Sequence, residues 1–246
     1  MFPSRAAAKR AIDESRVRVV GVPEPRAATM VQPGTAVTII EAGPAWASRG
    51  GEKLAAALDH FPITVSGCAA LDVGASTGGF TDVLLSRGAA TVTAVDVGYG
   101  QLVWRLRTDP RVTVADRTNF RYADLAALGA PFDLVVVDVS FISIGLLAGR
   151  LLDAGHSDTD YVVLVKPQFE VGRGRLAPGG VVADPALHRA AVETVIASLD
   201  TAGLGARGLI SSPIRGAKGN REFLLHLRPG PVTIHPTLPE EVTRPS

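Results

Sequence analysis

Short apolar segments separated by helix-forming sequence dominate the chain from about residue 53 onward. Several are unbroken apolar runs, which is typical of strands that are buried on both faces of a parallel sheet. Between them, a helix over 79–87 ends before Gly88, and Asp184 with Pro185 caps a helix that runs to about Thr201. This alternation predicts an α/β fold with a mainly parallel, doubly wound sheet. The expected strands are 69–73, 91–97, 111–115, 133–139, 161–165, 205–211 and 222–227.

The composition excludes several classes of protein. Hydrophobic residues make up 46% of the 246 residues and aromatic residues only 5%, so the chain can fill a sizeable aliphatic core. The single cysteine, Cys68, precludes an intrachain disulfide and fits a reducing compartment. No apolar run reaches the roughly 18–20 residues that span a bilayer, and no signal-peptide core follows the basic start. We therefore expect a soluble cytoplasmic protein.

The first 41 residues differ from the rest of the chain. They predict a helix over 4–14, a strand near 16–20, a proline-rich turn and a second strand at 35–40. Glycine and proline in the next eleven residues predict a linker. The expected parts are a small domain at 1–41, a linker at 42–52, a large domain at 53–230 and a loose, proline-rich tail at 231–246.

A glycine-rich turn lies between the first predicted strand of the large domain and the helix that follows it, in the sequence LDVGASTGGF of residues 71–80. Glycines at such a turn allow the backbone to approach a ligand closely, and doubly wound sheets bind ligands at the carboxyl ends of their strands. The turn lacks the G-x-G-x-x-G pattern, which disfavours a NAD-dependent dehydrogenase. Asp96 ends the next strand, where a carboxylate can accept hydrogen bonds from two ribose hydroxyls, and Asp116 ends the strand after it.

Four ionisable residues lie in contexts that suggest a single site. Asp138 and Lys166 follow the fourth and fifth predicted strands, so they face the same crevice of a parallel sheet. Glu222 opens the last strand, and Lys53 stands at the start of the large domain. A lysine directly after a buried strand is unfavourable unless it has partners. We therefore expect Asp138 and Glu222 to orient the two lysines.

In order and context, these four residues resemble the Lys-Asp-Lys-Glu tetrad of the FtsJ-like ribose 2′-O-methyltransferases. The chain is more specifically similar to the TlyA family of these enzymes, over nearly all of residues 46–228. The matching segments are 48–51 (SRGG), 74–80 (GASTGGF), 96–102 (DVGYGQL), 117–119 (RTN), 140–143 (SFIS) and 166–172 (KPQFEVG).

This resemblance implies a Rossmann-like class I methyltransferase fold with a mostly parallel seven-stranded sheet, helices on both faces, and S-adenosylmethionine as cofactor. It also implies 2′-O-methylation of cytidine ribose in 16S ribosomal RNA, in 23S ribosomal RNA or in both, within ribosomal subunits. We expect neither a metal nor an obligate protein partner. The expected cofactor-binding residues are Asp72, Gly74, Ser76, Thr77, Gly78, Gly79, Phe80, Asp96, Val97, Asp116, Arg117 and Asp138.

The tetrad also predicts a mechanism. Methylation of a ribose hydroxyl requires removal of its proton as the oxygen attacks a methyl group carried by a sulfonium. Nearby positive charge and desolvation favour the neutral form of a lysine. We therefore expect Lys166 to act as the base, with Lys53 and the sulfonium favouring its neutral form.

Residues 4–41 resemble the back part of the S-four-like RNA-binding domain, a small α+β domain, on the basis of the strand at 16–19 followed by Gly21. The helix that usually comes first in this domain is not represented, so we expect a truncated version. Basic side chains on phosphates and a flipped target nucleotide are the expected mode of RNA binding. The candidate contacts are Arg5, Lys9, Arg10, Arg16, Arg18 and Arg49, with Arg121 as a further candidate.

Three other kinds of protein stay open at this point. A binding protein without catalysis would not need the complete tetrad. A methyltransferase that acts on another substrate would need neither the basic first domain nor the pair of lysines. Because some members of the TlyA family are named haemolysins, a haemolysin-type protein is the third alternative, although the sequence has no membrane-spanning segment.

Overall fold

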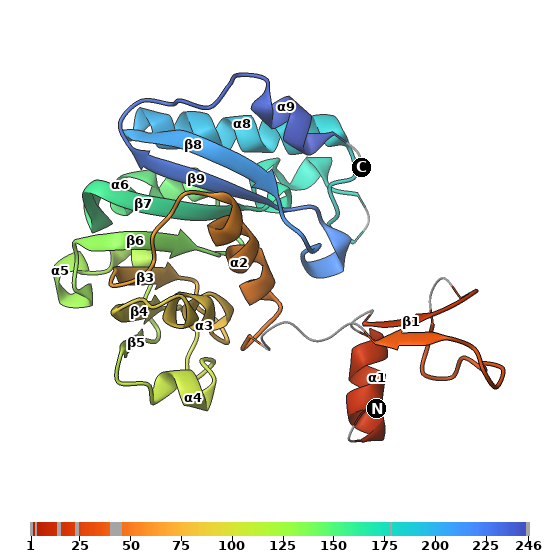
Figure 1. The fold of residues 1–246 in the computed structure, drawn as a ribbon. Helices are drawn as coiled ribbons and strands as arrows, with labels where there is room; N and C mark the ends of the chain where they lie inside the picture. Colours follow the sequence, from red (N-terminus) through yellow and green to blue (C-terminus); the bar gives the residue numbers. More distant parts are fainter. Residues whose placement is uncertain are drawn as a thin grey trace. The chain divides into compact units, whose positions relative to one another are not determined.

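The computed structural model describes residues 2, 4–13, 16–22, 25–39, 46–177 and 179–244. The chain divides into two compact units, Met1–Ala45 and Trp46–Ser246. Figure 1 shows the two units, which are described separately below.

The first unit consists of helix α1 (Arg5–Asp13) and a two-stranded antiparallel sheet of β1 (Val17–Val19) and β2 (Val37–Ile39). Its core is small and is formed by Ala11, Val17 and Val19. A two-stranded sheet with one helix buries little apolar surface, so few contacts stabilise this unit. The order of helix, strand and strand agrees with the sequence analysis, and the identification as an S-four-like domain stays a prediction.

The second unit is built on a seven-stranded sheet in the order β5-β4-β3-β6-β7-β9-β8. Strands β3 to β7 pair in parallel, whereas β9 runs antiparallel to both β7 and β8. The prediction of a mostly parallel, seven-stranded sheet is therefore confirmed. The strands are β3 (Ala69–Val73), β4 (Thr91–Val95), β5 (Val112–Ala115), β6 (Phe132–Val137), β7 (Gly155–Val165), β8 (Leu204–Ser211) and β9 (Phe223–Pro229).

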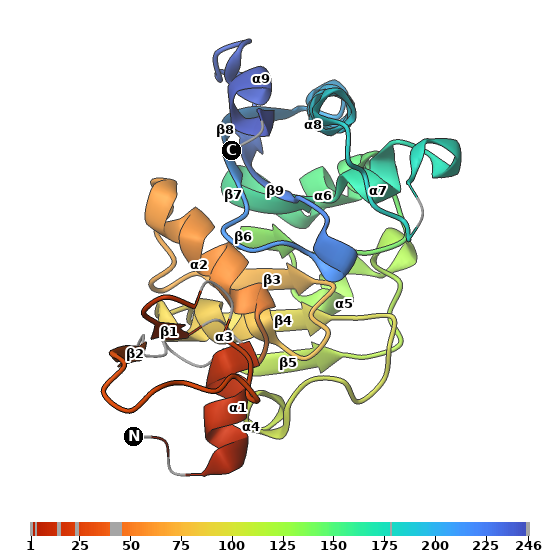
Figure 2. The same cartoon turned by 90° about the vertical axis from the view of Figure 1, so that its right-hand side faces the viewer.

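Helices cover both faces of this sheet (Figures 1 and 2). Alternate side chains of each strand enter different cores: Val162 and Leu164 of β7 pack with α2 and α3, whereas Tyr161 and Val163 pack with α6 and α8. The α-helices are α2 (Gly50–His60), α3 (Gly79–Ser86), α4 (Trp104–Arg107), α5 (Leu125–Leu128), α6 (Ala148–Ala154), α7 (Pro167–Glu170), α8 (Pro185–Thr201) and α9 (Leu238–Thr243). Short 3-10 helices are η1 (Phe120–Tyr122), η2 (Ile144–Leu147), η3 (Arg173–Arg175) and η4 (Ala217–Gly219).

Residues 46–52 belong to the second unit, although the sequence analysis placed them in a linker; residues 42–45 lie outside the described residues. Helix α2 already begins at Gly50. A Cβ atom on Gly51 would clash with the Trp46 side chain, and the Ala47 amide donates to Asp82 of α3 at 2.8 Å. The glycines therefore serve close packing here, and their presence was wrongly interpreted as a sign of a linker.

The segment after β9 is ordered by helix α9, where the sequence analysis expected a loose tail. Ile234, Leu238 and Val242 pack against the apolar core, and they are spaced four residues apart as on one face of a helix. Arg221 donates to the carbonyl oxygen of Thr243 at 2.9 Å and so fixes the end of the helix. The prolines in this segment concealed the helical spacing, because Pro239 falls in the first turn, where a helix tolerates proline.

Because α9 packs against the core, we expect Leu238→Ala to lower the free energy of unfolding by about 2 kcal/mol. The substitution removes a partly buried apolar contact with the core. The more exposed Val232 provides a matched control, for which Val232→Ala is expected to change stability by less than about 0.5 kcal/mol. Denaturant unfolding measures both values. Equal effects of the two substitutions would contradict the docking of α9.

Candidate active site

The glycine-rich turn between β3 and α3 lies against the end of β6. The register pairs Val73 with Val137, so Gly74 and Asp138 are adjacent, and a Cβ atom on Gly74 would clash with the Asp138 carbonyl oxygen. Gly74 has a φ of +89°, which favours glycine for a second reason. Ser76 also adopts a left-handed φ, +49°, and its amide donates to Asp96 of the β4 end at 2.8 Å. The turn is thus held by both neighbouring strands.

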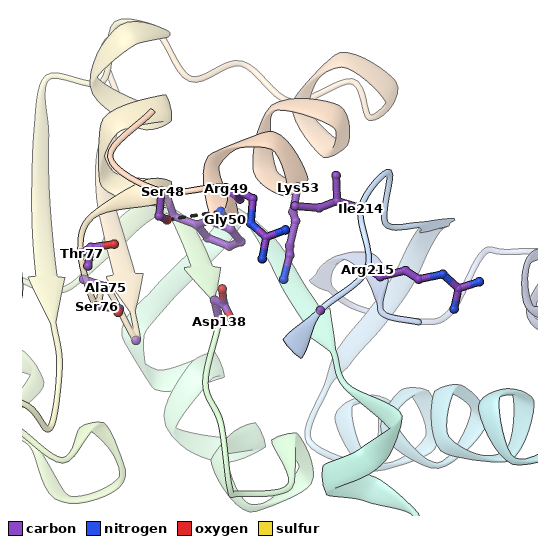
Figure 3. Close-up of a pocket in the computed structure, with 14 residues that line it drawn as sticks. Ser48, Arg49, Gly50, Lys53, Ala75, Ser76, Thr77, Asp138, Ile214 and Arg215 are labelled. Atoms are coloured by element: carbon purple, nitrogen blue, oxygen red, sulfur yellow. Dashed lines mark hydrogen bonds between the residues drawn. The ribbon is translucent and has the colours of Figure 1, made fainter. Parts of the chain in front are cut away.

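A cavity of about 430 Å³ opens between this turn, the start of α2 and the segment 214–216. Lys53 and Arg49 extend from α2 toward Asp138, as Figure 3 shows. Arg215 borders the cavity as well, but its side chain points away from these residues. Of the expected cofactor-binding residues, those that line the cavity are Gly74, Ser76, Thr77, Gly79, Phe80 and Asp138.

Asp72 lies beneath the turn and does not line the cavity. Its carboxyl group is fully buried and accepts a hydrogen bond from the Thr81 hydroxyl at 2.6 Å. Burial, opposed by the hydrogen bond from Thr81 and assisted by the nearby carboxylates of Asp138 and Asp96, raises the pKa of Asp72 to about 7. A carboxyl group with a raised pKa therefore lies directly beneath the turn.

The other expected cofactor-binding residues lie outside the cavity lining. Asp96 accepts hydrogen bonds from the amides of Ser76 and Gly98, at 2.8 and 2.7 Å. A hydrogen bond from Arg107 lowers the pKa of Asp116, and the carboxylate of Asp116 also accepts from the Gly100 amide. These two carboxylates fix the loops after β4 and β5. The remaining expected residues are Val97, Arg117 and Gly78. Val97 is exposed, the Arg117 guanidinium lies 4.2 Å from the centre of the Tyr99 ring, and Gly78 precedes α3.

The four residues of the predicted tetrad form two ion pairs at the carboxyl edge of the sheet. Lys53 Nζ lies 2.5 Å from Glu222 Oε2, and Lys166 Nζ lies 2.6 Å from Asp138 Oδ1. Lys53, Lys166 and Glu222 are 8%, 9% and 3% exposed. The register pairs Val165 with Phe223, which places Lys166 and Glu222 side by side. Charges buried to this extent need partners, and each lysine has one.

Gly216 makes room for the Glu222 carboxylate, because a Cβ atom at position 216 would clash with Oε1 of Glu222. The pairing of Lys53 with Glu222 thus depends on a glycine in the loop between β8 and β9. This glycine and the neighbouring Arg215 were not among the residues that the sequence analysis selected. Their contribution depends on a loop conformation that spacing alone does not show.

Two more residues near Lys166 were missed as site residues, although they belong to the segment SFIS. Ser140 accepts a hydrogen bond from Lys166 Nζ at 2.8 Å, beside the ion pair of this lysine with Asp138. Phe141 is 91% exposed, adopts a left-handed φ of +67°, and its ring centre lies 5.1 Å from that of Phe169. The Phe169 ring in turn lies 5.9 Å from Lys166 Nζ, and an exposed aromatic ring in a strained backbone conformation at such a place is a signal of function that only the structure reveals.

The predicted RNA contacts are distributed over both units. In the first unit, Arg5, Lys9 and Arg18 are exposed and Arg16 is half-buried, whereas the side chain of Arg10 lies outside the described part of the chain. In the second unit, Arg49 borders the cavity, and the Arg121 guanidinium lies 5.5 Å from the centre of the Tyr122 ring. The assignment of these residues to RNA stays a prediction.

Comparison with known proteins now identifies the family. Residues 46–229 match the FtsJ-like methyltransferase model. The chain belongs to this family. Among its FtsJ-like relatives, the 16S/23S rRNA (cytidine-2′-O)-methyltransferase TlyA of Mycobacterium tuberculosis is 49% identical over 92% of this chain and 84% of its own length. Hemolysin A of Brachyspira hyodysenteriae is 41% identical over 74% of this chain and 76% of its own. A solved structure from Streptococcus thermophilus, named as a haemolysin, has a TM-score of 0.81 and 39% identity over 98% of this chain and 90% of that one.

The buried Asp72 predicts a pH-dependent difference in stability. Its pKa is about 7 in the folded protein against an ordinary value of 3.8, so the stability that its protonated form contributes is complete at low pH and is lost as the pH rises through 7. Asp72→Asn keeps an acceptor for Thr81 but does not titrate. We expect its free energy of unfolding to rise, relative to that of the wild type, by on the order of 3 kcal/mol between about pH 4 and about pH 8. Unfolding by denaturant across this range tests it, and a difference that does not vary with pH would contradict it.

Proposed function

We propose that the protein transfers a methyl group from S-adenosylmethionine to the ribose 2′-hydroxyl of a cytidine in ribosomal RNA, within a ribosomal subunit. The observation that carries the proposal is the pair of buried lysine–carboxylate contacts beside the glycine-rich turn. The 49% identity to a TlyA enzyme named for this reaction supports the choice of substrate. We also propose that the protein acts in the cytoplasm, where a substrate of this kind is found.

The residues around the cavity fit S-adenosylmethionine. The cavity of about 430 Å³ has the size of a small-ligand site, which is roughly 300–1,000 Å³. Backbone groups of the glycine-rich turn border it, and carboxylates of Asp96 and Asp138 lie at the neighbouring strand ends, where they suit ribose hydroxyls and a cation respectively. When bound, the cofactor supplies an electrophilic methyl group on a sulfonium.

Lys166 is placed to take the proton of the attacking hydroxyl. The O–H bond of the ribose breaks as its oxygen attacks the methyl carbon, and the proton passes to the neutral amine of Lys166. Asp138 and Ser140 lie within 2.6 and 2.8 Å of Nζ and stabilise the ammonium that forms. These two contacts also orient the amine of Lys166. Its lone pair faces the substrate before the proton is transferred, and the new N–H bond faces it afterwards.

Lys53 has a different role. Its ammonium group is held by Glu222 and borders the cavity with Asp138, so it supplies positive charge where a hydroxyl oxygen becomes negative. Removal of Glu222 alone would leave this lysine buried without a partner, which costs about 3–5 kcal/mol in other buried pairs.

RNA recognition combines charge and stacking. Arg49 and Arg215 at the cavity suit phosphate groups, which fix the register of the RNA without reading its sequence. Exposed basic residues of the first unit extend this binding. The ring of Phe141 offers a surface on which a flipped base stacks, and it directly follows Ser140, which accepts from the lysine that takes the ribose proton.

A haemolysin-type function is the alternative that the names of two relatives raise. In the described part of the chain, no helix is long and apolar enough to cross a membrane. The two buried ion pairs beside a ligand-sized cavity have a direct role in methyl transfer, so this reaction is the function that we propose.

Lys166→Met is expected to lower the rate of methyl transfer at least about 100-fold, because the general base is lost. The assay uses radiolabelled S-adenosylmethionine with separated, unmodified small and large ribosomal subunits. Wild-type label that resists alkali at a single dinucleotide identifies a ribose methyl group. Lys218→Met, at an exposed lysine of η4, is the matched control and is expected to keep the wild-type kcat. Equal rates for the two variants would exclude Lys166 as the base.

Phe141→Ala is expected to raise the KM for RNA about tenfold while the affinity for S-adenosylmethionine stays unchanged, because one base–aromatic stack contributes about 1–3 kcal/mol. Leu146→Ala is the control, since Leu146 is another exposed apolar side chain close by in sequence. Steady-state kinetics with varied RNA and calorimetry with the cofactor separate the two effects. An unchanged KM would contradict stacking on Phe141.

A further inference from the structure

We propose that Glu170 is a positioning residue that holds the loop 140–143 in the conformation in which Ser140 accepts from Lys166 and Phe141 packs against Phe169. This inference rests on the proposed function, because it assigns Glu170 a role in the same site. Glu170 is the last residue of α7, the single turn that begins directly after Lys166. It touches none of the groups that react.

The carboxylate of Glu170 binds the far end of the loop with both oxygens. Oε2 accepts a hydrogen bond from the Ser143 hydroxyl at 2.6 Å, and Oε1 accepts from the Ile144 amide at 3.0 Å. Ile144 opens η2, whose own preceding residue makes no side-chain cap. The loop is therefore fixed by a residue that lies 26 to 27 positions farther along the chain.

Beyond the ion pair of Lys166 with Asp138, a series of contacts connects the segment after β6 with the segment after β7. Lys166 donates to Ser140, the ring of Phe169 contacts that of Phe141, and Glu170 binds Ser143. Successive residues of one segment contact successive residues of the other. The two segments therefore run side by side, starting at the ion pair. Glu170 makes the last contact and closes this series.

Phe141 explains why the loop needs an anchor at its end. A left-handed φ for a bulky residue costs on the order of 1–3 kcal/mol and persists only when the surroundings hold it. Asp138 fixes the start of the loop through its amide, which donates to Val73, and Glu170 fixes the end. Without the second anchor, the backbone at Phe141 can relax, so that its ring leaves Phe169 and the Ser140 hydroxyl leaves Lys166.

A capping residue that served only the stability of η2 would behave differently. Its removal would lower the free energy of unfolding but would leave KM and kcat of the folded enzyme unchanged. A positioning residue changes catalysis through Ser140 and Phe141. The two roles are therefore separated by kinetics and by the dependence of one substitution on another.

Substitutions at Glu170 distinguish geometry from charge. In Glu170→Gln, the amide oxygen can accept from the Ile144 amide and the NH₂ group can donate to the Ser143 hydroxyl, so both contacts are kept. Glu170→Ala loses both. Glu193→Ala removes an exposed glutamate of α8 and serves as the control for loss of a carboxylate.

The experiment measures kcat and KM of RNA methylation for the wild type, these three variants, Phe141→Ala and the double variant Phe141→Ala/Glu170→Ala. We expect kcat/KM to fall about tenfold in Glu170→Ala and to return to within about twofold of the wild type in Glu170→Gln, with Glu193→Ala unchanged. The double variant is expected to be little worse than the worse single variant, because both act through the same loop. Wild-type kinetics in Glu170→Ala, or effects that multiply fully in the double variant, would overturn the proposal.

Amide hydrogen exchange gives a readout that does not need activity. The Ile144 amide is expected to exchange faster in Glu170→Ala than in the wild type and in Glu170→Gln. A wild type that methylates no ribosomal RNA would overturn the proposed function, and the exchange of Ile144 would still decide whether Glu170 holds the loop. Unchanged exchange in Glu170→Ala would overturn the anchoring itself.

Discussion

Burial of charge at one edge of the sheet is the constraint on which this structure depends. Lys53, Lys166 and Glu222 are almost entirely withdrawn from water, and each would be strongly destabilising alone. Their pairing requires that α2, β6, β7 and β9 meet within a few ångströms. The close approach of Gly74 to Asp138 and of Gly216 to Glu222 permits this meeting, since a methyl group at either glycine would push a strand end away.

The same edge explains which parts of the fold and of the site could be predicted from sequence. Strands such as β6 and the central part of β7 are recognisable in the sequence as apolar runs. A charged residue directly after such a run is unfavourable unless it has partners, so its presence indicates a ligand site. Asp138 and Lys166 were therefore recognisable before any coordinates, and Lys53 and Glu222 followed from their resemblance to a known tetrad. The pairing of Lys53 with Glu222, 169 positions apart, needed the structure.

The features that the sequence did not reveal depend on the conformation of the backbone. The glycines at 50 and 51 signal a linker in isolation, but here one of them accommodates the Trp46 side chain. The prolines after β9 hid the helix α9, whose apolar spacing is short and begins in a loop. Phe141 belongs to a segment that matches the family, but its importance follows from a φ value and from an exposed ring, neither of which a residue type encodes.

The direction of β9 has a consequence for how the protein is made. Because β9 runs against its neighbours, its first residues lie at the edge where the parallel strands end, and Glu222 reaches Lys53 from there. Lys53 precedes Glu222 by 169 positions, so a growing chain delivers the lysine long before its partner. This ion pair is thus completed only after the start of β9 has left the ribosome, so a chain that ends before Glu222 carries an unneutralised lysine at this edge of the sheet.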